Sequence, residues 1–272
     1  MSTAGWIGKS ETRTDPMNPW PSRAFCRTLE LARPEPGEGD PLPAFWHWMH
    51  FPDVRPRSEL GPDGHPAVGG FIPKVAQPRR MWAGGRLQVH RPLPLGLPAA
   101  RVSTIANVAE KTGKAGAMTF VTVRHEVTGA AGLALTEEQD IVYREDPDPG
   151  VPKPAPRMAA TDETHTREWM CDTTVLFRYS ALTFNGHKIH YDLRHATEVE
   201  GYSGLVVHGP LLAKLLLELA HEIGAVSEFS YRLTAPVFAD EPFTVCAREQ
   251  GDGLALWVRG ADGRLAIEGQ SL

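Results

Sequence analysis

The sequence has few cysteines and no long hydrophobic run. Its 272 residues include only Cys26, Cys171 and Cys246, which are far apart and lack CxxC spacing. This pattern argues against both a disulfide framework and a thiolate zinc site. No window approaches the roughly 18 uninterrupted apolar residues of a membrane-spanning helix, and the N-terminus lacks the apolar core of a secretory signal. We therefore expect no membrane contact and a cytoplasmic location.

An excess of positive charge is also missing. The chain has 28 Lys and Arg against 33 Asp and Glu, which gives a formal net charge of -5. It offers no sequence-wide cationic surface for a phosphate backbone, so nucleic acid is not an expected partner. With 42% hydrophobic residues, the length suffices for one large core or two medium ones.

A proline-rich segment at residues 146–160 divides the chain. It contains Pro147, Pro149, Pro152, Pro154 and Pro156, which exclude a regular helix or a central strand. The segment predicts a linker between an N-terminal domain at 1–145 and a C-terminal domain at 161–272.

Alternating apolar and polar residues predict strands in both halves. The predicted strands lie in residues 100–113, 117–129 and 133–145, and in residues 227–237, 242–250, 254–260 and 264–272. Asp252-Gly253 and Asp262-Gly263 join the last three, and such pairs are strong hairpin signals because Gly accepts positive φ. Each half therefore contains an antiparallel sheet.

One helix is predicted in each half. Residues 205–224 are apolar nearly all round, so this helix must be wrapped, and the following sheet is available to wrap it. Residues 17–32 predict a weaker amphipathic helix that starts near Pro21. We infer an α+β protein with two helix-plus-sheet units, the first degenerate. Residues 42–54 and the Pro/Gly-rich stretch to Gly85 fit no regular element and are expected to form a surface or lid segment.

A polar stretch, "TFNGHKIHYD", runs from Thr183 to Asp192 between a strand predicted at 173–184 and the apolar helix. The first N–H groups of a helix have no intrahelical partners. Since Gly209 and Pro210 stand at the predicted helix start, the Gly209 N–H can face a cavity and stabilise an oxyanion.

Three interpretations compete for the histidines of this stretch. A metal site needs three or more ligands, and His187 and His190 have no third ligand near them in the sequence. In a structural interpretation the histidines satisfy loop carbonyls and Asp192 caps the next turn. In the third interpretation His190 is a general base. For His187 and His208 the structural interpretation is at least as good as a chemical one.

The residues 185–192, "NGHKIHYD", and the following "GYSGLVVHGPLLAKLLL" resemble the MaoC-like, (R)-specific enoyl-CoA hydratase family. The family motif runs S-G-D-x-N-P-L-H-x-D, followed by a helix that opens with I-V-H-G-M. "RYSALTFNGHKIHYD" is similar to the double hot dog branch with the hydroxyacyl-thioester dehydratases type 2 and the itaconyl-CoA and mesaconyl-C4-CoA hydratases. "FWHWMHF" and "EEQDIVYRE" extend a thinner similarity to the first half. The resemblance implies a double hot dog fold with a degenerate N-terminal half.

The resemblance also implies site residues. His190 falls on the general base, Gly209 on the oxyanion-hole glycine and Asn185 on the catalytic aspartate. Asn185 departs from the family because an amide cannot ionise and can only orient water through its C=O and NH2. The implied reaction is reversible addition of water to a 2,3-enoyl thioester, with one site per chain, no metal, and coenzyme A only as part of the acyl-CoA substrate. A homodimer is implied as well.

The substrate is less defined. A short branched dicarboxylyl-CoA, such as mesaconyl-C4-CoA or itaconyl-CoA, needs a cationic partner, for which Arg178, Arg80 and Arg86 are candidates. Each is also a possible ordinary surface arginine. Further substrate-binding candidates are His187, Val207 and His208. Alternatives are a 3-hydroxyacyl-thioester dehydratase of fatty acid synthesis, a hot dog acyl-CoA thioesterase and a non-catalytic acyl-CoA-binding protein.

Overall fold

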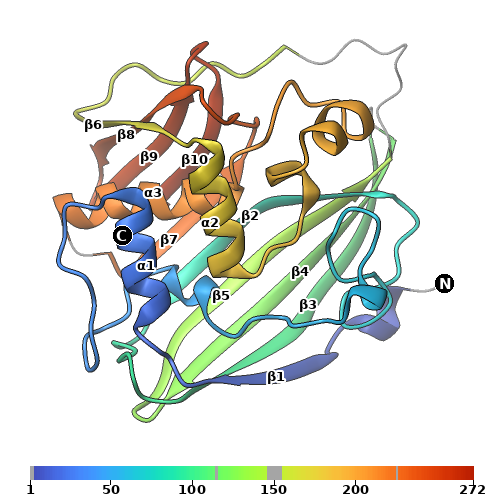
Figure 1. Cartoon of the computed structure of the whole chain (residues 1–272), viewed down its shortest axis with the longest axis horizontal. Helices are drawn as coiled ribbons and strands as arrows, with labels where there is room; N and C mark the ends of the chain where they lie inside the picture. Colours follow the sequence, from blue (N-terminus) through green and yellow to red (C-terminus); the bar gives the residue numbers. More distant parts are fainter. Residues whose placement is uncertain (1–2, 114–115, 146–154, 225) are drawn as a thin grey trace.

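The computed structural model describes residues 3–113, 116–145, 155–224 and 226–272. Within these ranges the strands form one antiparallel sheet in the order β1-β3-β4-β5-β2-β7-β10-β9-β8-β6 (Figure 1). The strands are β1 Ser10–Asp15, β2 Arg79–Val89, β3 Ala99–Gly113, β4 Gly116–Gly129, β5 Gly132–Arg144, β6 His165–Met170, β7 Glu228–Leu233, β8 Pro242–Gln250, β9 Gly253–Gly260 and β10 Leu265–Ser271.

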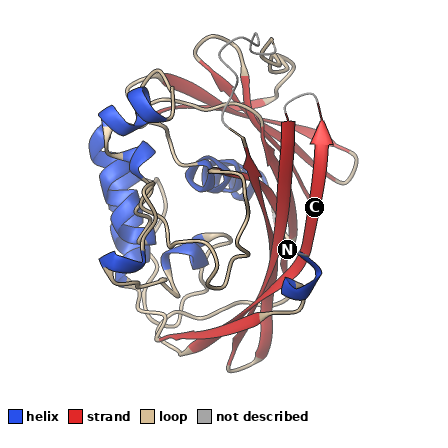
Figure 2. Cartoon of the chain, turned by 90° about the vertical axis from the view of Figure 1, so that its right-hand side faces the viewer, coloured by secondary structure: helices blue, strands red, loops and turns tan. Residues whose placement is uncertain are grey.

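The α-helices in the described ranges lie on one face of this sheet (Figure 2). They are α1 Trp20–Leu29, α2 Thr173–Thr183 and α3 Gly209–Ile223, with the short helices η1 Thr3–Trp6, η2 Trp46–Met49, η3 Arg57–Glu59, η4 Lys188–His190 and the π-helical turn η5 His195–Val199. The two five-stranded halves join where β2 pairs with β7, with Gly85 opposite Tyr231. The result is two hot dog units that share one continuous sheet, as the resemblance predicts.

The helix α3 is wrapped as expected. Every residue from Leu211 to Ala220 is buried, and the helix packs against β8, β9 and β10. The counterpart of α3 in the first half, α1, packs on α2 and η2 instead of on the strands, so the first unit lacks an enclosed helix. No helix in the described ranges is both long and apolar enough to cross a membrane.

The aromatic segment that contains η2 corrects one prediction. Residues 45–51 are not a surface lid, because Phe45, Trp46 and His47 are fully buried and Phe51 is nearly so. These residues show neither helical nor strand spacing of apolar side chains, so the sequence did not indicate that they belong to the core. Their aromatic side chains bury a large apolar area. The buried Glu137 of β5 accepts hydrogen bonds from the His47 and Trp48 side chains at 2.6 and 2.7 Å, which fixes the segment to the sheet.

Other predicted elements also change. Residues 173–184 were expected as a strand but form α2, which Asp172 caps by accepting a hydrogen bond from the Val175 N–H. The strands β1 and β6 were not predicted because short, polar edge strands carry little alternation. The strand β2 begins at Arg79, inside the segment expected to be irregular. In the first predicted hairpin the glycine with positive φ is Gly251 instead of Gly253.

One further prediction is confirmed, and another concerns residues that are partly outside the described ranges. The hairpin at Gly263 has the expected positive φ of 82°. Residues 146–154 of the predicted linker lie outside the described residues, so the linker and the domain boundaries that it defines stay predictions.

A lysine is buried inside the apolar helix α3. The Lys214 Nζ lies 4.9 Å from the centroid of the Phe25 ring, 5.0 Å from that of Tyr179 and 5.8 Å from that of Trp48. It has no hydrogen-bond partner among the described residues. Burial lowers the pKa of Lys214 to about 7, because the ring faces replace only part of the lost hydration.

We expect Lys214→Met to stabilise the protein. Since the pKa of Lys214 is lower in the folded than in the unfolded state, folding pays the full cost of the buried charge below about pH 7 and less as the pH rises towards the unfolded pKa. Replacing a buried charge by an apolar side chain of similar length should raise the free energy of unfolding by about 1–3 kcal/mol at pH 6 and by less at pH 9. Urea denaturation at both pH values, with the exposed Lys111→Met as control, measures this; destabilisation at pH 6 would contradict it.

Candidate active site

A cavity of about 1380 Å³ lies where the two halves meet. The first half contributes side chains of β2, β4 and β5 to its wall, and the second half contributes α2, the loop before η4, the start of α3 and β7. Of the residues predicted from the sequence, Asn185, His187, His190, Val207, Gly209 and Arg80 line the cavity. The site is therefore shared between the two units.

His190 has a fixed tautomer. Its Nδ1 lies 2.7 Å from the Val206 carbonyl oxygen, which can only accept, so Nδ1 carries the proton and donates. The other ring nitrogen, Nε2, is therefore an acceptor. Burial lowers the pKa of His190 to about 3, so the imidazole is neutral at physiological pH. A neutral, oriented imidazole is suited to accept a proton from water.

His208 lies behind His190 instead of on the cavity wall. The two rings stack with centroids 3.5 Å apart and planes 17° from parallel. His208 is fully buried, and its Nε2 lies 2.9 Å from the Ser180 Oγ. His208 therefore packs against the ring of His190 and does not line the cavity, whereas the sequence predicted a substrate contact for it.

The first residue of α3 is Gly209, as predicted. Its N–H has no backbone acceptor among the described residues, and Pro210 after it has no N–H. The Gly209 N–H therefore lies at the N-terminal end of α3 in the cavity wall, where the helix dipole adds to its partial positive charge. This geometry suits a developing oxyanion.

Asn185 is engaged within its own loop. Its Oδ1 accepts a hydrogen bond of 2.9 Å from the His187 N–H, which fixes the amide in the cavity wall. The second lone pair of Oδ1 and the NH2 group can still bind water, so the predicted role of both amide groups stays a prediction. In the same loop the Tyr191 hydroxyl donates to the Gly186 carbonyl, and Asp192 accepts from the His195 N–H, which confirms its predicted capping role.

A segment of the first half contacts this loop. The Lys188 N–H donates to the Asp63 carbonyl at 2.9 Å, and a Cβ on Gly64 would lie only 1.9 Å from the Gly186 carbonyl oxygen. Gly64 also has a φ of +92°, so the contact requires glycine for two reasons. It brings Asp63 and His65 to the catalytic loop. Neither residue was predicted from the sequence, where their only local signal is "DGHP" in a Pro/Gly-rich stretch.

Asp63, His65 and His187 form a cluster whose nitrogen and oxygen atoms lie within 4.8 Å of one another. His187 has no third ligand near it in the sequence, but in the fold Asp63 and His65 lie beside it. In the fold, however, His65 Nδ1 and Asp63 Oδ2 are hydrogen-bonded at 2.9 Å, which occupies one donor atom of each. The Arg80 guanidinium is also close enough to lower the pKa values of His65 and His187, although burial lowers both more strongly. That neighbouring positive charge opposes a bound cation.

The three candidate arginines lie in different places. Arg80 is half-buried, lines the cavity and has no ion pair within the described part of the chain. Arg178 is exposed on α2 and does not line the cavity. Arg86 is exposed and pairs with Glu138 and Asp140 at 2.8 and 3.0 Å. Of these three, only Arg80 lines the cavity.

A double hot dog with a neutral imidazole beside a free helix N-terminus is the architecture of an enoyl-thioester hydratase or dehydratase. The sequence profile of the family "Hydroxyacyl-thioester dehydratase type 2" matches residues 45–239. The chain belongs to this family, which confirms the resemblance, and it is a hydro-lyase that acts on enoyl thioesters.

Individual relatives agree with this assignment. The mesaconyl-C(4)-CoA hydratase of Chloroflexus aurantiacus is 46% identical over 98% of this chain and 97% of its own. Among solved structures, HtdX of Mycobacterium tuberculosis has a TM-score of 0.72 at 18% identity and covers 97% of this chain and 99% of its own. Another M. tuberculosis protein, described as a double hotdog fold, has a TM-score of 0.59 at 14% identity, covering 97% and 95%. These two structures support the fold.

We expect Asn185→Asp to keep its activity within about tenfold of the wild type, which corresponds to roughly 1.4 kcal/mol of activation free energy. A carboxylate oxygen can accept the same His187 N–H and preserve the loop. Steady-state hydration kinetics, with circular dichroism to check the fold, test this. Complete inactivation of a folded variant would show that the amide NH2 is itself needed.

Proposed function

We propose that the protein hydrates a short branched dicarboxylyl-CoA, with mesaconyl-C4-CoA as the first candidate. Arg80 carries this proposal, because it lies in the wall of a largely apolar cavity and has no ion pair among the described residues. The 46% identity to a mesaconyl-C(4)-CoA hydratase over nearly the whole chain supports the same substrate class. A saturated fatty acyl chain would leave this guanidinium without a partner in the bound complex.

The residues of the site divide the reaction between them. His190 Nε2 accepts a proton from water while the water oxygen bonds to C3 of the enoyl group. The π electrons of the C2–C3 double bond move towards the thioester, and the negative charge forms on the carbonyl oxygen. The Gly209 N–H and the dipole of α3 stabilise that oxygen. Protonation of C2 then completes the hydration.

The free carboxylate of the substrate binds to Arg80 in this proposal. Burying a carboxylate is unfavourable unless a hydrogen-bonded cation accompanies it. Arg80 lies on the side of the cavity near His65 and His187, and its strand partner is Tyr143 of β5. The nearby Trp82, Val123 and Ile141 also line the cavity and offer apolar contacts to the methyl group and chain.

A panel of mesaconyl-C4-CoA, itaconyl-CoA and crotonyl-CoA tests the activity. We expect the wild type to prefer a dicarboxylyl thioester and His190→Ala to lose at least about 10³-fold in kcat/KM, because the base is gone. Loss of enoyl-thioester ultraviolet absorbance and the mass of the hydrated product are the measurements. Retention of most of the rate by His190→Ala would refute the assignment of the base. Thiol release without hydration would point to a thioesterase instead.

Arg80→Gln tests the carboxylate contact. We expect the KM for mesaconyl-C4-CoA to rise about 10- to 100-fold, since loss of a charged hydrogen bond costs roughly 1.5–3 kcal/mol. The kcat/KM for crotonyl-CoA, which has no free carboxylate, should stay within about threefold under the same criterion. Arg86→Gln, on the same strand but outside the cavity, is the matched control. Equal losses on both substrates would show that Arg80 supports the fold of the cavity and does not select the carboxylate.

A further inference from the structure

We propose that His65, backed by the carboxylate of Asp63, is the far end of a histidine relay that holds the proton of the attacking water. The relay runs from His190 through His187 to His65. It rests on the hydratase activity and on His190 as the base, and it does not depend on which acyl chain is bound.

His190 by itself is a poor place for this proton. The partner of its Nδ1–H is the neutral Val206 carbonyl, and no carboxylate is hydrogen-bonded to its ring in the described structure. Asn185, the other polar side chain of its loop, cannot ionise. An imidazolium at this buried position is therefore weakly stabilised, as the low pKa of His190 reflects. The proton needs a more favourable acceptor nearby.

His65 has the anionic partner that His190 lacks. Its Nδ1–H donates to Asp63 Oδ2 at 2.9 Å, which leaves Nε2 as the acceptor. The His65 N–H and ring hold the pKa of Asp63 well below its usual range against the effect of burial, so Asp63 is ionised. A carboxylate in this position fixes the tautomer of a histidine and stabilises the imidazolium when a proton arrives.

The three imidazoles are in contact through His187. The rings of His65 and His187 have centroids 4.3 Å apart, and those of His187 and His190 are 5.5 Å apart and perpendicular. All three residues line the cavity. Burial lowers the pKa of His187 to about 2, so His187 is neutral before the reaction.

The charged groups that face His65 oppose each other. Burial and Arg80 lower the pKa of His65, and Asp63 raises it. His65 is therefore neutral and ready to accept a proton before the reaction.

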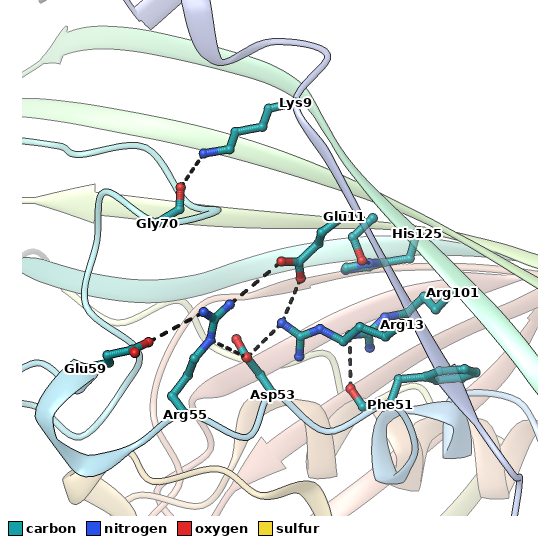
Figure 3. A network of polar contacts seen from close by, with 11 residues as sticks. Lys9, Glu11, Arg13, Phe51, Asp53, Arg55, Glu59, Gly70, Arg101 and His125 are labelled. Atoms are coloured by element: carbon teal, nitrogen blue, oxygen red, sulfur yellow. Dashed lines mark hydrogen bonds and ion pairs between the residues drawn. The ribbon is translucent and has the colours of Figure 1, made fainter.

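The segment that carries Asp63 and His65 is fastened at its base as well as at its tip. Figure 3 shows Arg13 paired with Asp53 at 2.8 Å, Arg55 paired with Asp53 at 2.7 Å, and Lys9 donating to the Gly70 carbonyl. At the tip, Gly64 contacts Gly186. These contacts hold His65 in place against His187, as a proton-transfer group requires.

The steps balance without a further reactant. The water O–H bond breaks as the C3–O bond forms, and the released proton binds to Nε2 of His190, because Nδ1–H is held by the Val206 carbonyl. The same Nε2 then releases it towards His187, which transfers it to Nε2 of His65. The π pair meanwhile forms the enolate at Gly209. The proton then returns along the same histidines to C2, the C2–H bond forms, and the enolate becomes a thioester carbonyl again. One water is consumed and no proton is gained or lost.

Two variants and a control test the relay with the full-length protein. For His65→Gln and Asp63→Asn we expect kcat to fall about 10- to 100-fold, in the range of general acid–base effects, with KM changed less than about threefold. Because Asp63 raises the pKa of His65, Asp63→Asn should also move the acid limb of the kcat profile to lower pH. The exposed His90→Gln should match the wild type.

His65→Ala separates chemistry from folding. Added imidazole should restore part of its kcat in a saturable way, because the truncated side chain leaves room for the free base. The relay is overturned by a kcat within threefold of wild type in both variants, by a loss confined to KM, by an unmoved acid limb, or by absence of imidazole rescue. A wild-type activity that EDTA removes and Zn²⁺ restores would overturn it too, since the cluster would then hold a cation. If the wild type hydrates no thioester of the panel while it remains folded, the proposed function fails instead.

Discussion

The burial of α3 is the constraint on which the rest of the structure depends. A helix with apolar residues on every side cannot stay in water, so the second half must curl its sheet around it. Its N-terminal end lies at the cavity wall, and this end carries Gly209. The same requirement places the His208–His190 stack beside the free N–H. In this unit the packing of the core therefore also positions the residues of the site.

The first half completes what the second half begins. Its sheet has no enclosed helix, so part of the space between sheet and helices is the cavity and part is filled by the buried aromatic segment 45–51. It also supplies Arg80 and the cluster around His65. The first half is degenerate because it lacks an enclosed helix and the catalytic motif. The cavity would nevertheless lack a wall without this half.

Much of this could be predicted from the sequence, because the relevant signals are local. The hairpins, α1, α3 and the residues around His190 follow from period, turn residues and one contiguous motif. The helix α2 was mistaken for a strand because its β-branched and aromatic residues outweighed the cap at Asp172. Asp63 and His65 were missed because their role arises from a contact with residues more than a hundred positions away. The homodimer and the cytoplasmic location stay predictions.

The contact of Gly64 with Gly186 links the evolution of the two halves. Neither backbone can gain a side chain there without separating the segment from the catalytic loop, so a change in one half is felt directly in the other. Residues 66–78, which follow the contact, bear no such restriction from it. A displacement of the Gly64 backbone, by contrast, would move the loop that carries His187 and His190.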